Sequence, residues 1–290
     1  MINFKRLPSS PSLLKLWEST SGTIPADGLA ALLSHQVGAL VVRDFYPEPH
    51  RQAMISKIEG LIANKKSANW QVTNLEGNLM DSDVDTIGIP LNMAIAQHKV
   101  QEYFDNSLAS TRQWRDQLVM SPIDKLRLEL DEVHPTGCQI GRDGARLHAA
   151  GLVRIMKRSM ASSLVHIDDV GETISNIGTF SANIYLQTAM VGGEVEIWPV
   201  SLPDKETLMD NAQAISLLTT ADVAAQAALK QHVLPLGPTL IIKPKPGDLL
   251  LLCVQRPHCV RGPIHGPHKR LSFQTFVVNQ SPQHALKVEV

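Results

Sequence analysis

The chain has 290 residues, of which 43% are hydrophobic and 19% are charged. This composition is ordinary for a folded globular protein, and the length allows one large domain with a substantial core or two smaller ones. Lysine and arginine together number 27 against 28 acidic residues, so the formal net charge is −1. No basic surplus is available to neutralise a phosphate backbone, and we therefore expect no nucleic-acid partner.

The apolar segments and the cysteines indicate a cytoplasmic protein without a membrane span. The N-terminal residues Met1 to Leu7 lack the apolar core of a signal peptide. The longest apolar run, Leu249–Val254, is too short to cross a bilayer and has the length of a buried strand. Cys138, Cys253 and Cys259 form no Cys-x-x-Cys pair, so we expect neither a disulfide framework nor a thiolate zinc site.

Residues 1–130 are predicted to form a mainly helical N-terminal layer. The pattern indicates a short helix at 26–35, a strand at 38–44 and a helix that opens at Pro47 and runs to about residue 63. A further helix is expected at 91–118. Residues 66–90, the polar stretch between the predicted helices 47–63 and 91–118, are predicted to form a surface loop.

From residue 136 onward the pattern changes to short apolar segments separated by Gly, Pro and Asn. Closely spaced segments of this kind predict an antiparallel β-barrel or sandwich, here residues 136–280, interrupted by an alanine-rich helical insertion at 204–230. The predicted strands are 150–157, 162–168, 179–188, 193–199, 232–235, 239–243, 248–254 and 270–278. The expected fold class is α+β, with both layers in one domain, residues 1–290.

One predicted strand carries a candidate pair of metal ligands, His166 and Asp168. Side chains two residues apart on a strand point to the same face, so the imidazole and the carboxylate can reach one ion together. Nitrogen and oxygen ligands suit iron(II) or another first-row dication. A histidine and an aspartate also occur in this spacing on exposed strands without a metal, so the pair requires a third ligand to be convincing.

The C-terminal part of the chain supplies that ligand and a candidate anion site. His258 lies 90 residues after Asp168, just beyond the apolar strand 249–254. Arg270 and Ser272 follow, two residues apart on one face of the strand 270–278. A guanidinium beside a hydroxyl is well suited to hold a carboxylate through charge-assisted hydrogen bonds.

Together these residues make the sequence resemble the 2-oxoglutarate/iron(II) dioxygenase superfamily over residues 150–278. The resemblance is carried by an ordered set of motifs: His166-x-Asp168, Gly192-Gly193-Glu194, Pro246-Gly-Asp248, His258 and Arg270-x-Ser272. It implies a double-stranded β-helix, the jelly-roll or cupin-like barrel, below a helical N-terminal layer. It also implies that His166, Asp168 and His258 bind Fe(II), and that Arg270 and Ser272 hold the distal carboxylate of the co-substrate 2-oxoglutarate.

The activity implied by this resemblance is O2-dependent hydroxylation of an unactivated C–H bond, with release of succinate and CO2. The layout is most similar to small bacterial hydroxylases of amino acids or N-acyl amino acids, and to the related free-standing halogenases. Those halogenases replace the metal-binding aspartate with a small residue, whereas this chain has Asp168. Oxygen insertion into a small molecule is therefore the expected chemistry, and the sequence does not indicate the oligomeric state.

Several neighbouring residues are weaker candidates. Arg154 could pair with a carboxylate of substrate or co-substrate, or with an acid at the barrel rim; Arg158 and Arg261 are similar but weaker candidates. Tyr185 and Gln187 could touch the co-substrate if their face of the strand points inward.

Two other functions remain open at the level of sequence. One is a cupin-type metal-dependent isomerase, lyase or ligand-binding barrel, which has no need of the carboxylate clamp Arg270-x-Ser272. The other is a hydroxylase that modifies a protein.

Overall fold

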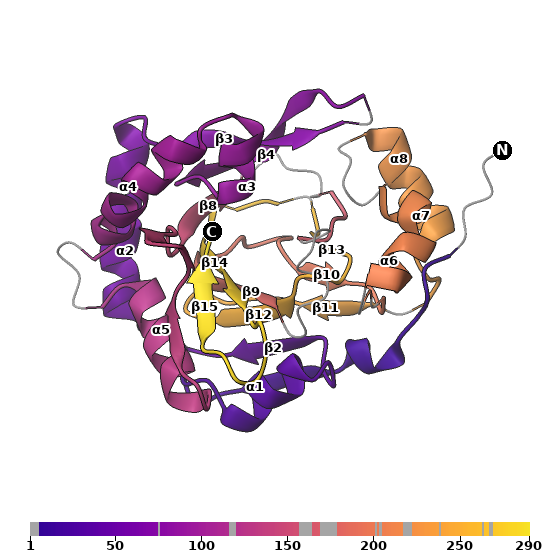
Figure 1. Cartoon of the computed structure of the whole chain (residues 1–290), viewed down its shortest axis with the longest axis horizontal. Helices are drawn as coiled ribbons and strands as arrows, with labels where there is room; N and C mark the ends of the chain where they lie inside the picture. Colours follow the sequence, from indigo (N-terminus) through magenta and orange to yellow (C-terminus); the bar gives the residue numbers. More distant parts are fainter. Residues whose placement is uncertain are drawn as a thin grey trace.

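A computed structural model describes residues 6–74, 76–115, 120–156, 164–168, 179–200, 202, 205–216, 222–237, 239–262, 264–266 and 269–290. Strands fill the centre of the molecule, and helices lie on either side of them (Figure 1). The helices are α1 (Ala26–Leu33), α2 (Glu48–Ala63), α3 (Leu91–Ala96), α4 (Val100–Gln113), α5 (Pro122–Val133), α6 (Lys205–Asp210), α7 (Ala212–Ser216) and α8 (Val223–Ala228). A π-helical turn, Leu229–Val233, continues α8. No helix in these ranges is long and apolar enough to cross a bilayer.

A large, mainly antiparallel sheet forms the centre of the fold. Its strands follow the order β1-β2-β12-β9-β14-β8-β4-β3, and β15 joins β14 to β5 at a branch. Their bounds are β1 Leu16–Ser19, β2 Ala39–Val42, β3 Ala68–Thr73, β4 Leu79–Ile87, β5 Cys138–Ile140, β8 Leu152–Met156, β9 Phe180–Gln187, β12 Leu249–Cys253, β14 Arg270–Val278 and β15 Leu286–Glu289. The main path runs from β1 to β3 without closing.

Two smaller sheets complete the strand content of the described residues. The first has the order β11-β10-β13, with β10 at Val195–Ile197, β11 at Leu240–Ile242 and β13 at His258–Val260. The second is a hairpin of β6 (Arg142–Asp143) and β7 (Arg146–Leu147).

The two faces of the large sheet bury different cores, as strand β12 illustrates. Leu249 and Leu251 belong to the main hydrophobic core, which includes apolar residues of α1, α2 and α5. Leu250 and Leu252 belong instead to a cluster with Val195, Ile197 and Ile242 of the small sheet. Because successive side chains of a strand alternate between faces, one face of the large sheet packs against helices and the other against the small sheet.

The α+β class and most expected elements are confirmed. Helices α1 and α2 agree with the predicted 26–35 and 47–63, and the alanine-rich insertion is helical in α6, α7 and α8. The loop predicted at 66–90 is wrong, because this stretch forms the hairpin β3–β4 at the edge of the large sheet.

Two further expectations on secondary structure need correction. The helix predicted at 91–118 is interrupted between α3 and α4, where His98 adopts a left-handed backbone conformation with φ of 56°. The strand predicted at 232–235 is wrong, since residues up to Val233 belong to the π-helical turn and no strand follows at 234–235.

Gly151 permits a close contact at the start of β8, and this gives a test of the core. A Cβ at this position would lie 2.2 Å from Cε1 of Phe273, whose buried ring packs perpendicular to Trp114. Overpacking a filled core typically costs about 1–3 kcal/mol. We expect Gly151→Ala to lower the free energy of unfolding by about this amount in a denaturant titration.

Gly60 provides the matched control. It lies inside α2, and no atom comes within 4 Å of the position that a Cβ would take there. Gly60→Ala should therefore raise the free energy of unfolding by about 0.4–1 kcal/mol. Equal effects of the two substitutions would contradict the packing described for Phe273.

Candidate active site

Two histidines that lie far apart in sequence face each other across a short antiparallel bridge. The backbone N–H of His166 donates to the carbonyl of His258 at 3.0 Å, and the N–H of His258 donates to the carbonyl of His166 at 2.9 Å. Residues that exchange both hydrogen bonds stand directly opposite each other, with their side chains on one face. The two imidazole centroids are accordingly 4.4 Å apart.

Asp168 completes a group of three potential metal ligands. Its backbone N–H donates to Val254 at 3.0 Å, which continues the extended path from His166 and places both side chains on the same face. The Nε2 atoms of His166 and His258 lie 3.5 and 3.6 Å from the two carboxylate oxygens. One ligand atom from each of the three side chains lies within 4.8 Å of the others, so together they could hold a single ion.

The hydrogen bonds of both histidines orient their rings for metal binding. Nδ1 of His166 lies 2.8 Å from the carbonyl of Leu164, and Nδ1 of His258 lies 2.8 Å from the carbonyl of Arg256. A carbonyl only accepts, so Nδ1 carries the proton in each ring and Nε2 presents its lone pair. Metal-binding histidines are commonly fixed in this way by a backbone carbonyl.

Burial and charge favour the ligand forms of these side chains. Burial, together with the neighbouring His166, lowers the pKa of His258 to about 4, so its imidazole is neutral near pH 7. Burial alone would raise the pKa of Asp168, but His258 and His166 hold it well below its usual range. Asp168 is therefore ionised, and its buried Oδ2 accepts no hydrogen bond from any described residue. An orphaned carboxylate oxygen beside two imidazole lone pairs fits a bound cation.

A side chain of the helical insertion holds the extended segment that carries His166. The buried Gln226 of α8 accepts from the N–H of Val165 at 2.9 Å and donates to its carbonyl at 3.0 Å. This amide pairs with the backbone as a neighbouring strand would, one residue before the first predicted ligand.

We expect Gln226→Leu to weaken metal binding about tenfold, because the polar groups of Val165 lose their partner and His166 loses its fixed position. Calorimetric titration with Mn(II) would measure this effect. Gln231→Leu, at an exposed position of the adjoining π-helical turn, should leave the affinity unchanged. An equal loss in both variants would show that Gln226 does not position the ligand.

Arg270 and Ser272 point to the same side of the large sheet, as predicted. Their neighbours Leu271 and Phe273 belong to the core shared with the helices, so Arg270 and Ser272 project from the opposite face. Ser272 stands opposite Arg154 in the register of β14 and β8. The structure thus brings these three predicted residues together on the face of the large sheet that looks toward the small sheet.

The guanidinium of Arg270 is buried without an anionic partner among the described residues. Its Nη2 donates to the hydroxyl of Tyr185 at 3.2 Å, and its Nη1 lies 3.0 Å from the sulfur of Met156, a weak acceptor. Nε of Arg270 and the hydroxyl of Ser272 lack any hydrogen-bond partner in the same part of the chain. Burial lowers the pKa of Arg270, which reflects the cost of a buried charge without a counter-ion.

Arg154 lies between this cation and the metal-ligand group. Its guanidinium sits over the ring of Trp70, 4.5 Å from the centroid, and its Nε has no hydrogen-bond partner among the described residues. Asp168 stabilises its charge, while burial and Arg270 oppose it. The charge of Arg154 thus interacts with Asp168 and Arg270, and Arg154 forms no ion pair within the described part of the chain.

The other candidates are placed as follows. Tyr185 contacts Arg270, and Gln187 is half-buried and stands opposite Leu271, across a register shift between β9 and β14. Arg261 is exposed and lies 3.8 Å from Glu196, away from the ligands. Arg158 lies outside the described residues. Trp70 and Gln226 were not identified from the sequence, since both act through contacts with residues more than sixty positions away.

The chain is thus an α+β protein with a large and a small sheet. Its His-Asp-His group is formed by segments that are distant in sequence. Solved structures share the fold. An N-substituted L-amino acid dioxygenase from Burkholderia ambifaria AMMD, in complex with alpha-ketoglutarate (2-oxoglutarate), is 14% identical and superposes with a TM-score of 0.54 over 91% of each chain. A second structure of such a dioxygenase from the same organism gives 15% identity and a TM-score of 0.53 over 92% of each chain. No family model and no curated protein matches the sequence.

Proposed function

We propose that this protein is an Fe(II)- and 2-oxoglutarate-dependent dioxygenase that hydroxylates a C–H bond of a small molecule and releases succinate and CO2. The observation that carries the proposal is the buried, anion-free guanidinium of Arg270 on the sheet face that also presents Arg154, whose charge Asp168 stabilises. A metal-binding barrel without 2-oxoglutarate has no use for such a cation, whereas a co-substrate with a distal carboxylate requires one.

In this proposal His166, Asp168 and His258 hold iron and leave other positions of the ion open. Bound iron, with 2-oxoglutarate and O2, supplies the oxidising power for the attack on the C–H bond. The protein's own contribution is geometric and electrostatic. The two Nδ1–H groups fix the imidazoles on backbone carbonyls, and Asp168 supplies the negative charge.

The co-substrate contacts follow from the orphaned polar atoms. Arg270 would bind the distal carboxylate of 2-oxoglutarate, and Ser272 would donate its unpaired hydroxyl to the same group. Tyr185 holds one edge of the guanidinium through its hydroxyl, so Arg270 keeps its orientation before the co-substrate arrives. Pre-orientation of this kind lowers the entropic cost of binding.

We further propose that the substrate is an amino acid or an amino acid derivative and that Arg154 binds its carboxylate. Arg154 is near enough to Asp168 for the carboxylate to stabilise its charge. The name of the fold neighbour, an N-substituted L-amino acid dioxygenase, supports the same class. Trp70 provides a flat apolar wall beside this cation.

We also propose a single oxygenase domain, residues 1–290, whose large and small sheets form an unclosed double-stranded β-helix. Packing of the two sheets through Val195, Leu250 and Leu252 supports this arrangement. The three cysteines are buried and outside any disulfide, which suits the reducing cytoplasm that we propose as the location.

Anaerobic spectroscopy tests the proposed function. Addition of Fe(II) and 2-oxoglutarate without O2 should produce the visible charge-transfer absorption of the chelate. The band should require His166 and His258, and succinate release in air should then identify the substrate from a panel of amino acids and N-acyl derivatives. Metal binding without the band would favour the cupin-type isomerase, lyase or ligand-binding alternative. A band, with succinate formed from 2-oxoglutarate only when a protein target is added, would favour the protein-modifying alternative.

A further inference from the structure

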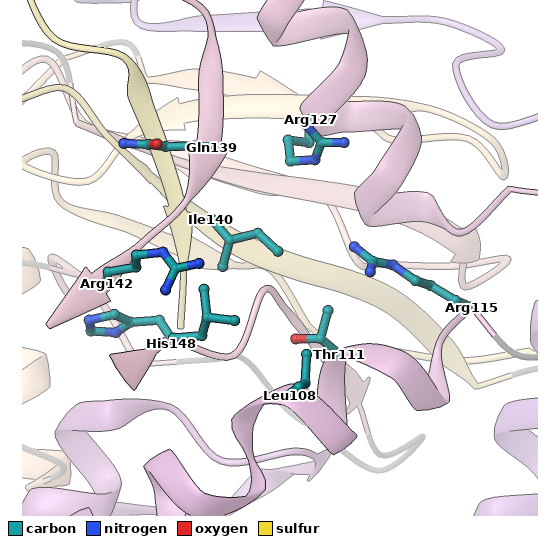
Figure 2. Close-up of a pocket in the computed structure, with 9 residues that line it drawn as sticks. Leu108, Thr111, Arg115, Arg127, Gln139, Ile140, Arg142 and His148 are labelled. Carbon is teal, nitrogen blue, oxygen red and sulfur yellow. The ribbon is translucent and has the colours of Figure 1, made fainter. Parts of the chain in front are cut away.

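A cavity of about 350 Å³ lies between helices α4 and α5 and the strands β5 to β7 (Figure 2). Three arginines contribute to its lining: Arg115 just beyond α4, Arg127 from α5 and Arg142 from β6. Figure 2 shows the Arg115 and Arg142 side chains extending from opposite sides toward Thr111 and Ile140.

The charge of this cavity is only partly compensated. Arg115 is held by Asp124, with Nη2 to Oδ1 at 2.8 Å. Arg142 donates only to the carbonyl of Ala145 at 3.3 Å, and Arg127 makes no hydrogen bond or ion pair, as far as the described residues show. The guanidiniums of Arg127 and Arg142 thus line the cavity without a counter-ion among the described residues.

The carboxylate of Glu289 lies beside Gly141, which precedes the lining residue Arg142. It fills the space beside Gly141, where a Cβ would meet its Oε2 at 2.0 Å. Burial raises the pKa of Glu289, and this effect favours the neutral acid. With Asp124 already paired to Arg115, the cavity keeps a positive excess from Arg127 and Arg142.

The neutral lining supplies a donor and an apolar wall. The hydroxyl of Thr111 accepts from the N–H of Ala150 at 3.2 Å, which leaves its own hydrogen free to donate. Leu108, Ile140 and Leu147 line the same cavity and offer a surface to a short carbon chain.

We propose that this cavity binds a compact organic dianion, with a phosphate monoester as the best match. Guanidinium forks and a hydroxyl that approach from several directions suit the tetrahedral oxygens of a phosphate. The site is separate from the proposed oxygenase centre. Helix α5, which supplies Arg127, packs on the face of the large sheet that carries Leu271 and Phe273, whereas Arg270 projects from the other face.

Calorimetric titration of the full chain with inorganic phosphate and glycerol 3-phosphate, at constant ionic strength, tests this proposal. We expect saturable binding of one equivalent. Arg127→Ala and Arg142→Ala should each weaken it about tenfold or more, since each removes charge-assisted hydrogen bonds. Arg142 lies on an exposed hairpin, so its replacement gives a folded variant even if the change in α5 destabilises the chain.

Two controls separate this site from general charge effects and from the oxygenase centre. Arg112→Ala removes an exposed arginine of α4 that does not line the cavity, and Arg270→Ala removes the proposed 2-oxoglutarate contact; neither should change phosphate affinity. Non-saturable phosphate binding, or an equal loss in Arg112→Ala, would overturn the proposal. Binding of succinate but not phosphate, with the same sensitivity to Arg127 and Arg142, would overturn the assignment to a phosphate.

Discussion

Asp168→Ala is expected to abolish succinate production and to weaken Mn(II) or Fe(II) binding by more than about a hundredfold. Even partners that only orient a ligand cost about 10–100-fold when removed, and Asp168 is the one negatively charged member of the group. Its loss leaves two neutral imidazoles to bind a dication. Metal titration by calorimetry and succinate release, both on the same preparation, would measure the two effects.

Asp83→Ala is the matched control, because this aspartate is exposed on β4 and takes no part in the ligand group. It should retain metal affinity and turnover. A thermal melt of Asp168→Ala establishes that the fold persists. Normal metal affinity in a folded Asp168→Ala variant would show that the ion is held elsewhere.

Replacing Arg270 with methionine is expected to weaken 2-oxoglutarate binding at least about thirtyfold while leaving Mn(II) binding intact. Truncation of one partner in a buried, hydrogen-bonded charge pair costs roughly 2–5 kcal/mol. Methionine keeps most of the buried volume, so the change removes the charge and the donor fork rather than the packing. Calorimetric titration of 2-oxoglutarate onto the Mn(II)-loaded protein would report the loss.

The same substitution should not destabilise the protein in the absence of co-substrate. Arg270 is a buried cation with only Tyr185 and Met156 as partners among the described residues, and replacement of an uncompensated buried charge by an apolar group is often neutral or stabilising. We therefore expect an unchanged or higher melting temperature for Arg270→Met. Arg146→Ala, which removes an exposed arginine paired with Asp143, should alter neither 2-oxoglutarate affinity nor metal affinity. A large drop in melting temperature for Arg270→Met would assign Arg270 a structural role.

The placement of the candidate site residues was partly predictable from their spacing, although His166 lies in an isolated bridge and not in a regular strand. His166 with Asp168, and Arg270 with Ser272, are pairs at a spacing of two, and that spacing alone places each pair on one face. The bridge between His166 and His258 was not predictable from spacing. It depends on the pairing of segments about ninety residues apart.

The errors have local physical causes. Strand β4 carries Asp81, Asp83 and Asp85, and its first half is largely exposed at the edge of the sheet. Acidic residues are depleted in strands and are typical of loops. The exposed first half of β4 therefore lacks the apolar alternation by which strands are recognised. The break between α3 and α4 contains no glycine or proline that would predict it from the sequence. The backbone of His98 is nevertheless left-handed.

Because successive residues of β14 face opposite sides of the sheet, substitutions on its two faces are expected to have different effects. Leu271 and Phe273 pack in the core that the sheet shares with its helices, and Arg270 and Ser272, the proposed co-substrate contacts, project from the opposite face. Substitutions at the second pair can change the recognised ligand without disturbing the helix interface. During evolution, substitutions at Arg270 and Ser272 could therefore change the bound co-substrate or substrate while the stability of the fold is retained.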